Sequence, residues 1–189
     1  MAIKPNEIET MRAHIEAAHG NVVTLGLGMG YFAYMVSEKS DVSSVTVIER
    51  AENVIELFRA VILPQFKHKD KIRIIHSDAF DYLDTLNALS NVDYLFADIW
   101  HDSSDGFPLY LRIKKREAGL KNIVFKYWIE DTLLFQLRSM LFSTAYGQLK
   151  AGDSLNLLGK EIVSADDLCE MLSSDNLKIL ARKLRRVDS

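Results

Sequence analysis

The sequence has few of the residues and runs that mark secreted, fibrous or membrane proteins. Cys169 is the one cysteine among 189 residues, so no disulfide can form within the chain, and we expect a reducing, cytoplasmic location. Nine glycines and three prolines are too few for a collagen-like or low-complexity chain. No apolar run reaches the roughly 18 residues needed to cross a bilayer, so we expect no membrane-spanning segment.

An excess of charge of one sign is also missing. With 26 acidic and 23 basic residues the formal net charge is -3, which gives no overall electrostatic reason to bind nucleic acid. The local exception is a predicted amphipathic helix over residues 176–187. Its basic face could contact RNA or an acidic partner, but we interpret it as solvated; its cations are Arg182, Lys183, Arg185 and Arg186. Histidines and cysteine show no metal-ligand spacing, so we expect no metal site.

The most informative stretch is VVTLGLGMGYF, residues 22–32. Its first four residues are aliphatic or β-branched without polar alternation, which predicts a strand buried on both faces of a parallel sheet. Gly26, Gly28 and Gly30 then permit a sharp turn and would let a ligand approach the backbone without meeting a Cβ. A helix predicted over residues 29–37 would direct its free N–H groups toward the same place.

Acidic residues follow the next two predicted strands. The strand over residues 45–48 ends at Glu49, 19 residues after Gly30, where a carboxylate can accept hydrogen bonds from a ribose diol. The strand over residues 72–75 leads to Asp78, which can cap the following helix or face an adenine amino group. In a parallel sheet the carboxyl ends of the strands lie at one edge, so these carboxylates are expected to gather around the glycine turn.

The run DIWHD, which starts at Asp98, follows a fourth predicted strand over residues 92–97. It concentrates titratable groups and an aromatic ring where the ligand cleft of a doubly wound sheet lies. Asp98, His101 or Asp102 could accept a proton there. The alternative is a loop that only solvates the chain, and we disfavour it because an exposed Trp100 would be unusual in such a loop.

Taken together, these strand ends resemble those of the class I S-adenosylmethionine-dependent methyltransferases over about residues 22–100. In that family the glycine motif receives the methionine part of the cofactor, and the second strand end holds the ribose. An acidic residue after the third strand contacts adenine, and the fourth strand end faces the reacting group. The resemblance implies S-adenosylmethionine as cofactor. It also implies cofactor-binding residues Gly26, Gly28, Gly30, Glu49, Arg50, Asp78, Ala79, Asp98 and Trp100, and catalytic candidates Asp98, His101 and Asp102.

DIWHD is also similar in placement to the acidic strand end of the polyamine aminopropyltransferases, which use decarboxylated S-adenosylmethionine. In those enzymes acidic residues hold a cationic amine, a role that Asp98, Asp102 and Asp105 could take here. Against this reading, the chain has no room for the separate N-terminal β domain expected of those enzymes.

Two further alternatives stay open. Gly28, Gly30 and Ala33 also fit the spacing of an NAD-binding turn, although a dehydrogenase normally needs a second domain for its substrate. A non-catalytic S-adenosylmethionine-binding module is the other alternative. After a fifth predicted strand over residues 123–128, the sequence shows no clear antiparallel pair of the kind that completes the methyltransferase sheet, and residues 155–158 are the only candidate.

We therefore predict one domain over residues 1–189: a three-layer, Rossmann-like α/β sandwich with helices on both faces and a helical C-terminus. Its mainly parallel five-stranded sheet has the predicted order 3-2-1-4-5. The predicted function is methyl transfer from S-adenosylmethionine to an acceptor, which we expect to be a small molecule. Since the sulfonium makes the methyl group electrophilic, such a protein has mainly to align the acceptor and help remove its proton.

Overall fold

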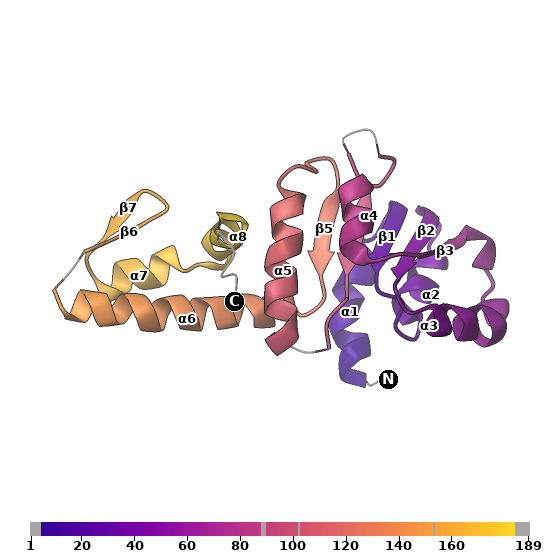
Figure 1. Ribbon diagram of the computed structural model, residues 1–189, viewed down its shortest axis with the longest axis horizontal. Coiled ribbons are helices and arrows are strands. Elements are labelled where there is room, and N and C mark those ends of the chain that lie inside the picture. Colours follow the sequence, from indigo (N-terminus) through magenta and orange to yellow (C-terminus); the bar gives the residue numbers. More distant parts are fainter. Residues whose placement is uncertain (1–4, 88–89, 102, 153, 184–189) are drawn as a thin grey trace. The chain divides into compact units, whose positions relative to one another are not determined.

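The computed structural model describes residues 5–87, 90–101, 103–152 and 154–183 (Figure 1). The chain divides into two compact units. Unit 1 is Met1–His101 with Arg116–Trp128, and unit 2 is Asp102–Lys115 with Ile129–Ser189. That all 189 residues form one S-adenosylmethionine-binding domain stays a prediction.

Unit 1 is built on a five-stranded sheet in which every neighbouring pair is parallel. Its strands are β1 (Gly20–Leu25), β2 (Val42–Glu49), β3 (Ile72–His76), β4 (Tyr94–Ala97) and β5 (Val124–Tyr127). Their order is β3-β2-β1-β4-β5. The predicted Rossmann-like α/β fold class and strand order are thereby confirmed.

Helices cover both faces of this sheet, as the apolar strands require. They are α1 (Pro5–Ala17), α2 (Tyr31–Ser37), α3 (Glu52–Leu57) and α4 (Ala79–Thr85). Helix α3 is followed by a π-helical turn, η1 (Phe58–Ile62), and a 3-10 turn, η2 (Leu63–Gln65). A further 3-10 turn, η3 (Lys69–Lys71), precedes β3.

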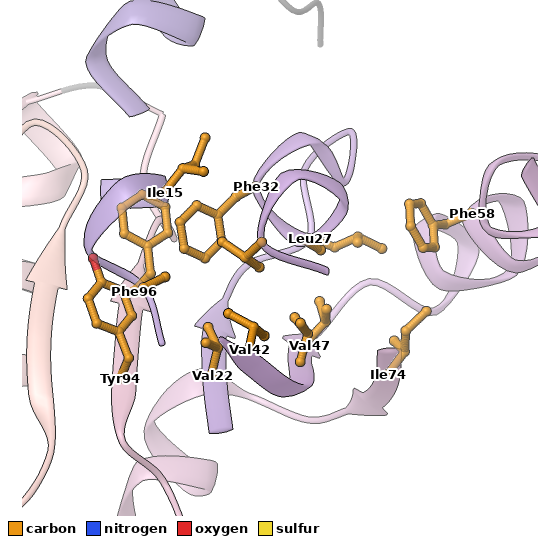
Figure 2. Packing of buried hydrophobic residues seen from close by; sticks show 14 of the residues in the cluster. Ile15, Val22, Leu27, Phe32, Val42, Val47, Phe58, Ile74, Tyr94 and Phe96 are labelled. Atoms are coloured by element: carbon orange, nitrogen blue, oxygen red, sulfur yellow. The ribbon is translucent and has the colours of Figure 1, made fainter. Parts of the chain in front are cut away.

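One face of the sheet packs against α1, α2 and the α3–η1 segment (Figure 2). The rings of Phe32 on α2 and Phe96 on β4 stack with centroids 4.1 Å apart. Because successive strand residues point to opposite faces, Leu25 and Leu95 are buried on the other face, where α4 contributes the buried Leu83. Both faces of the sheet are therefore shielded from water, which explains why its strands lack an alternation of apolar and polar residues.

Unit 2 consists of helices and one hairpin. It contains most of α5 (Ser103–Glu117), with α6 (Glu130–Lys150), α7 (Ala165–Met171), α8 (Ser174–Lys183), and the strands β6 (Leu155–Leu157) and β7 (Lys160–Ile162). The helical C-terminal region is confirmed as far as Lys183, whereas Arg185 and Arg186 lie outside the described residues. The candidate strand at residues 155–158 is present as β6, and it pairs with β7, but the two strands form an antiparallel sheet of their own.

Candidate functional site

Three glycines with positive φ build the turn between β1 and α2. The φ angles are 93° at Gly26, 53° at Gly28 and 79° at Gly30, in a region that residues with a Cβ rarely adopt. The Gly26 N–H donates to the carbonyl oxygen of Ile48 at 2.8 Å, which fixes the turn against β2. Consequently α2 begins at Tyr31, later than the predicted start at residue 29.

Packing within the protein accounts for two of these glycines. A Cβ added to Gly26 would collide with the backbone carbonyl oxygen of Asp98, and one added to Gly30 would collide with the ring of Phe58. At both positions the missing side chain makes room for the protein itself. Clearance for a ligand is therefore not needed to explain them, and their part in ligand binding stays a prediction.

Glu49 ties the end of β2 to the glycine turn. Its Oε2 accepts a hydrogen bond from the Leu27 N–H at 3.0 Å, and its Oε1 accepts one from the Ala51 N–H at 2.8 Å. These two backbone donors hold the side chain in one orientation. Each carboxylate oxygen has a second lone pair, so the group can still accept a hydrogen bond from a ligand.

The ends of β2 and β3 are joined through the neighbouring residues. His76 Nε2 lies 3.0 Å from the backbone carbonyl oxygen of Arg50, whose side chain is exposed. Asp78 caps α4, because its Oδ1 accepts a hydrogen bond from the Phe80 N–H at 2.8 Å. The capping role considered for Asp78 is thus present, and Ala79 is the buried first residue of α4.

Asp98 follows β4 on the other side of the glycine turn. Its N–H donates to the carbonyl oxygen of Leu25 at 2.9 Å, and its side chain is partly buried. Burial raises the pKa of this carboxyl group to about 7, and the charge of Glu7 on α1 adds to the increase. A carboxyl group with this pKa can exchange a proton at neutral pH.

The other residues of DIWHD differ in burial. Trp100 is only 5% exposed, so its ring is packed inside the protein and does not by itself indicate a functional loop. Its Nε1 is buried and has no hydrogen-bond partner within the described part of the chain. His101 is exposed, whereas Asp102 lies outside the described residues. Their catalytic roles stay predictions.

The register of the sheet brings the main candidates together. Leu25 of β1 pairs with Ile48 of β2 on one side and with Ala97 of β4 on the other. Glu49 and Asp98 are the next residues, so they flank the glycine turn from both sides. The strand order reverses its direction between β1 and β4, the place where ligands bind in open α/β sheets.

Sequence reasoning found these residues because each directly follows an apolar run. It missed Phe58, Leu27 and Glu7, which reach the turn or Asp98 through tertiary packing alone. Across the described ranges no helix is long and apolar enough to span a membrane. No group of three or more His, Cys, Asp or Glu side chains in these same ranges is arranged to hold a metal ion.

No family model and no curated protein matches the sequence. Solved structures similar to the chain include a conserved hypothetical protein from Streptococcus pyogenes, with a TM-score of 0.48 and 15% identity over 62% of this chain and 69% of that one. Spermidine synthase from Thermotoga maritima has a TM-score of 0.47 and 14% identity over 64% of this chain and 43% of that chain. A putative O-methyltransferase from Klebsiella pneumoniae has a TM-score of 0.43 and 16% identity over 61% of this chain and 51% of that chain.

The chain thus spans about half, or less, of the two enzymes. Their names fall within the two groups that the sequence resembles, methyltransferases and polyamine enzymes. With TM-scores below 0.5 these similarities carry no argument about activity or ligand. The strand order and register establish the fold: unit 1 is a Rossmann-like α/β domain with a parallel sheet in the order 3-2-1-4-5.

Proposed function

We propose that unit 1 binds S-adenosylmethionine at the carboxyl edge of its sheet and that the protein is an S-adenosylmethionine-dependent methyltransferase. The observation that carries this proposal is the position of Glu49, held by the Leu27 and Ala51 N–H groups directly beside the glycine turn. A fixed carboxylate at this strand end suits the two hydroxyl groups of a ribose.

Other groups around the turn suit the remaining parts of S-adenosylmethionine. We propose that the glycine turn receives the amino acid group, and Asp78 offers a carboxylate near the position expected for adenine. The carboxyl groups of Glu49 and Asp98, on either side of the glycine turn, also favour a cationic ligand, because a nearby positive charge stabilises a carboxylate. An NAD pyrophosphate would bring negative charge to the same place, so we rank that alternative lower.

When bound, S-adenosylmethionine would supply a methyl group whose carbon is made electrophilic by the positively charged sulfur, and S-adenosylhomocysteine would be the leaving group. Asp98 would orient the acceptor and take the proton that an amine or hydroxyl loses. With a pKa of about 7, its carboxylate form grows as the pH rises through neutrality, and so would the rate. The acceptor is proposed to be a small molecule, with His101 and Asp102 as further proton acceptors.

Calorimetric titration with S-adenosylmethionine and S-adenosylhomocysteine tests the proposal. Glu49→Gln keeps the size of the side chain but removes its charge, and we expect at least a tenfold loss of affinity. Glu52→Gln is the matched control, because Glu52 is exposed in the first turn of α3, and its affinity should equal that of the unmodified protein. Absence of binding to the unmodified protein, or equal losses in both variants, would overturn the proposal.

One observation favours a second candidate, an aminopropyltransferase-like activity. The partly buried Asp98 is near Glu7, and two carboxyl groups close together suit a cationic amine acceptor. In this case decarboxylated S-adenosylmethionine would bind more tightly than S-adenosylmethionine, and product would form with a polyamine. Tight binding without transfer to any acceptor pool would instead indicate a non-catalytic binding module.

A further inference from the structure

Helix α6 in unit 2 has two apolar faces. The first is buried within the unit and consists of Leu133, Leu134, Leu137 and Ala145. The hairpin, α7 and α8 lie on one side of α6 (Figure 1). The second face contains large side chains that this packing leaves exposed, with Phe135 at 64% and Tyr146 at 43%. An ordinary surface helix has a polar outer face, so the second apolar face requires an explanation.

The residues of this second face follow a regular spacing. Steps of four, three, four and three residues connect Phe135, Ser139, Phe142, Tyr146 and Leu149, which we call the seam. This is the spacing at which two helices pack side by side in coiled coils. The rings of Phe142 and Tyr146 are stacked, with centroids 5.5 Å apart and planes 10° from parallel, so they form one continuous aromatic surface.

We propose that the seam pairs with the seam of a second copy of this chain, with the two α6 helices antiparallel. In this arrangement Phe135 faces Tyr146 of the second copy, and Ser139 faces Phe142 of the second copy. A large side chain therefore meets a small one at the centre, as close packing requires. Since the interface is two-fold symmetric, each contact occurs twice.

The charges at the ends of the helix select this orientation. The antiparallel register brings Asp131 level with Lys150 of the second copy, which places opposite charges at both ends of the pair. A parallel pair would instead align Asp131 with Asp131 and Lys150 with Lys150, and it would align the two helix dipoles. Arg138 lies level with the neutral Ser143 of the second copy, so no like charges meet along the seam.

The remaining surface beside the seam adds to the interface. The Arg138 side chain lies against the end of α7, since its Nε donates to the carbonyl oxygen of Leu172 at 2.9 Å. Next to it lies a depression of about 260 Å³, lined by Arg138, Phe142, Cys169, Leu172 and Ser173. The seam spans about 21 Å, which is short for a permanent dimer, so we expect reversible association that depends on concentration.

Sedimentation of the full chain at several concentrations tests the pairing. The unmodified protein should form a reversible dimer, and Phe135→Glu or Tyr146→Glu should weaken dimerisation at least tenfold, because each change acts twice. Met140→Glu is the matched control: Met140 is 52% exposed on the same helix but lies about 140° around it from Phe135, so its dimer should persist. A monomer at every concentration, or a dimer that survives both seam variants, would overturn the proposal.

The orientation has its own test, in a Cys169→Ser background. A mixture of Phe135→Cys and Tyr146→Cys chains should be joined by a short thiol crosslinker, whereas neither variant alone should crosslink efficiently. Crosslinking of Phe135→Cys with itself would show a parallel pair and contradict the antiparallel register. Asp131→Lys should weaken the dimer, and the addition of Lys150→Asp should restore it.

Discussion

The two units use glycine for different reasons. In unit 1, Gly26 has a φ of 93° and lies so close to Asp98 that its Cβ would strike a backbone carbonyl oxygen. In unit 2, Gly152 has nearly the same φ, 89°, but apart from its chain neighbours no heavy atom of the described residues lies within 4 Å of where its Cβ would be. The same backbone conformation thus reflects tertiary packing in one unit and only local chain reversal in the other.

Charge is also treated differently in the two units. In unit 2, Glu130 has cations on both sides, with the Lys114 Nζ at 3.6 Å and the Lys178 Nζ at 3.5 Å, and the Tyr110 hydroxyl donates to its Oε1 at 2.8 Å. In unit 1, the pKa of Asp98 is raised by the burial of its own carboxyl group and by the nearby carboxylate of Glu7. A satisfied buried charge is structural, whereas a carboxyl group kept at a raised pKa is typical of a functional site.

The glycine comparison predicts the largest effect. Gly26→Ala should destabilise unit 1 by more than about 3 kcal/mol, because the positive φ and the collision with the Asp98 carbonyl oxygen act together. Gly152→Ala should cost about 1 kcal/mol, the strain of the conformation alone. Urea unfolding of both variants measures the difference. Equal losses would show that the contact with Asp98 has no energetic weight and would remove the first contrast between the units.

The charged cluster of unit 2 predicts a smaller but clear loss. Glu130→Ala should destabilise the protein by about 3 kcal/mol, because it removes a carboxylate from beside the almost fully buried Lys114. Glu170→Ala, which breaks the exposed pair with Lys160, should change stability by less than about 0.5 kcal/mol. Thermal and urea unfolding measure both. A negligible effect at Glu130 would mean that the cluster is not structural.

The raised pKa of Asp98 predicts a pH dependence whose sign is opposite to that of most acidic residues. Its folded pKa of about 7 exceeds the ordinary aspartate pKa of 3.8, so the folded state binds the proton more tightly than the unfolded state. The stabilisation is complete below the unfolded pKa and is lost as the pH rises through about 7. Asp98→Asn should therefore gain about 2 kcal/mol relative to the unmodified protein between pH 5 and 8.5.

Unfolding in urea at both pH values measures this difference. Glu7→Gln should reduce the dependence without removing it, because burial is the larger cause of the raised pKa. A stability of the unmodified protein that rises relative to Asp98→Asn toward high pH would reverse the sign and contradict the account.

The parallel sheet could be predicted because its signals are local. Glu49 and Asp98 each come directly after a largely apolar run, so they could be placed at strand ends before their neighbours were known. The contact between Gly30 and Phe58 could not be predicted, because it depends on a π-helical turn that places the ring against the glycine. The same holds for Glu7, which is 91 residues from Asp98 in the sequence.

In the hairpin of unit 2 the sequence offered only the first strand as a candidate, and the pairing with β7 was missed for a different reason. Two-residue hairpin turns are usually recognised from Asn-Gly or Asp-Gly, whose residues tolerate positive φ. Here the turn between β6 and β7 has Leu158 at a φ of 54° followed by Gly159 at 83°. A leucine in this conformation gives no sequence signal, and strands of three residues are too short to show alternation. The division into two units has no composition shift or linker to mark it.

The helix caps give the smallest expected effect and the finest contrast between the units. Asp78 caps α4 in unit 1 through the Phe80 N–H, and Ser164 caps α7 in unit 2 through the Asp167 N–H at 3.1 Å. Asp78→Ala and Ser164→Ala should each cost about 1 kcal/mol of stability, since each leaves a helix N–H without its side-chain acceptor. Ser164→Ala should leave the affinity for S-adenosylmethionine unchanged.

Asp78→Asn separates the two roles proposed for this residue. Asparagine caps helices about as well as aspartate, so the stability should stay within about 0.5 kcal/mol of the unmodified protein. A carboxylate that accepts a hydrogen bond from an adenine amino group is stronger than a neutral amide, so the affinity measured by calorimetry should fall severalfold. If the affinity stays the same while Asp78→Ala loses both stability and binding, Asp78 acts only as a cap. The ligand would then be held by the residues that flank the glycine turn.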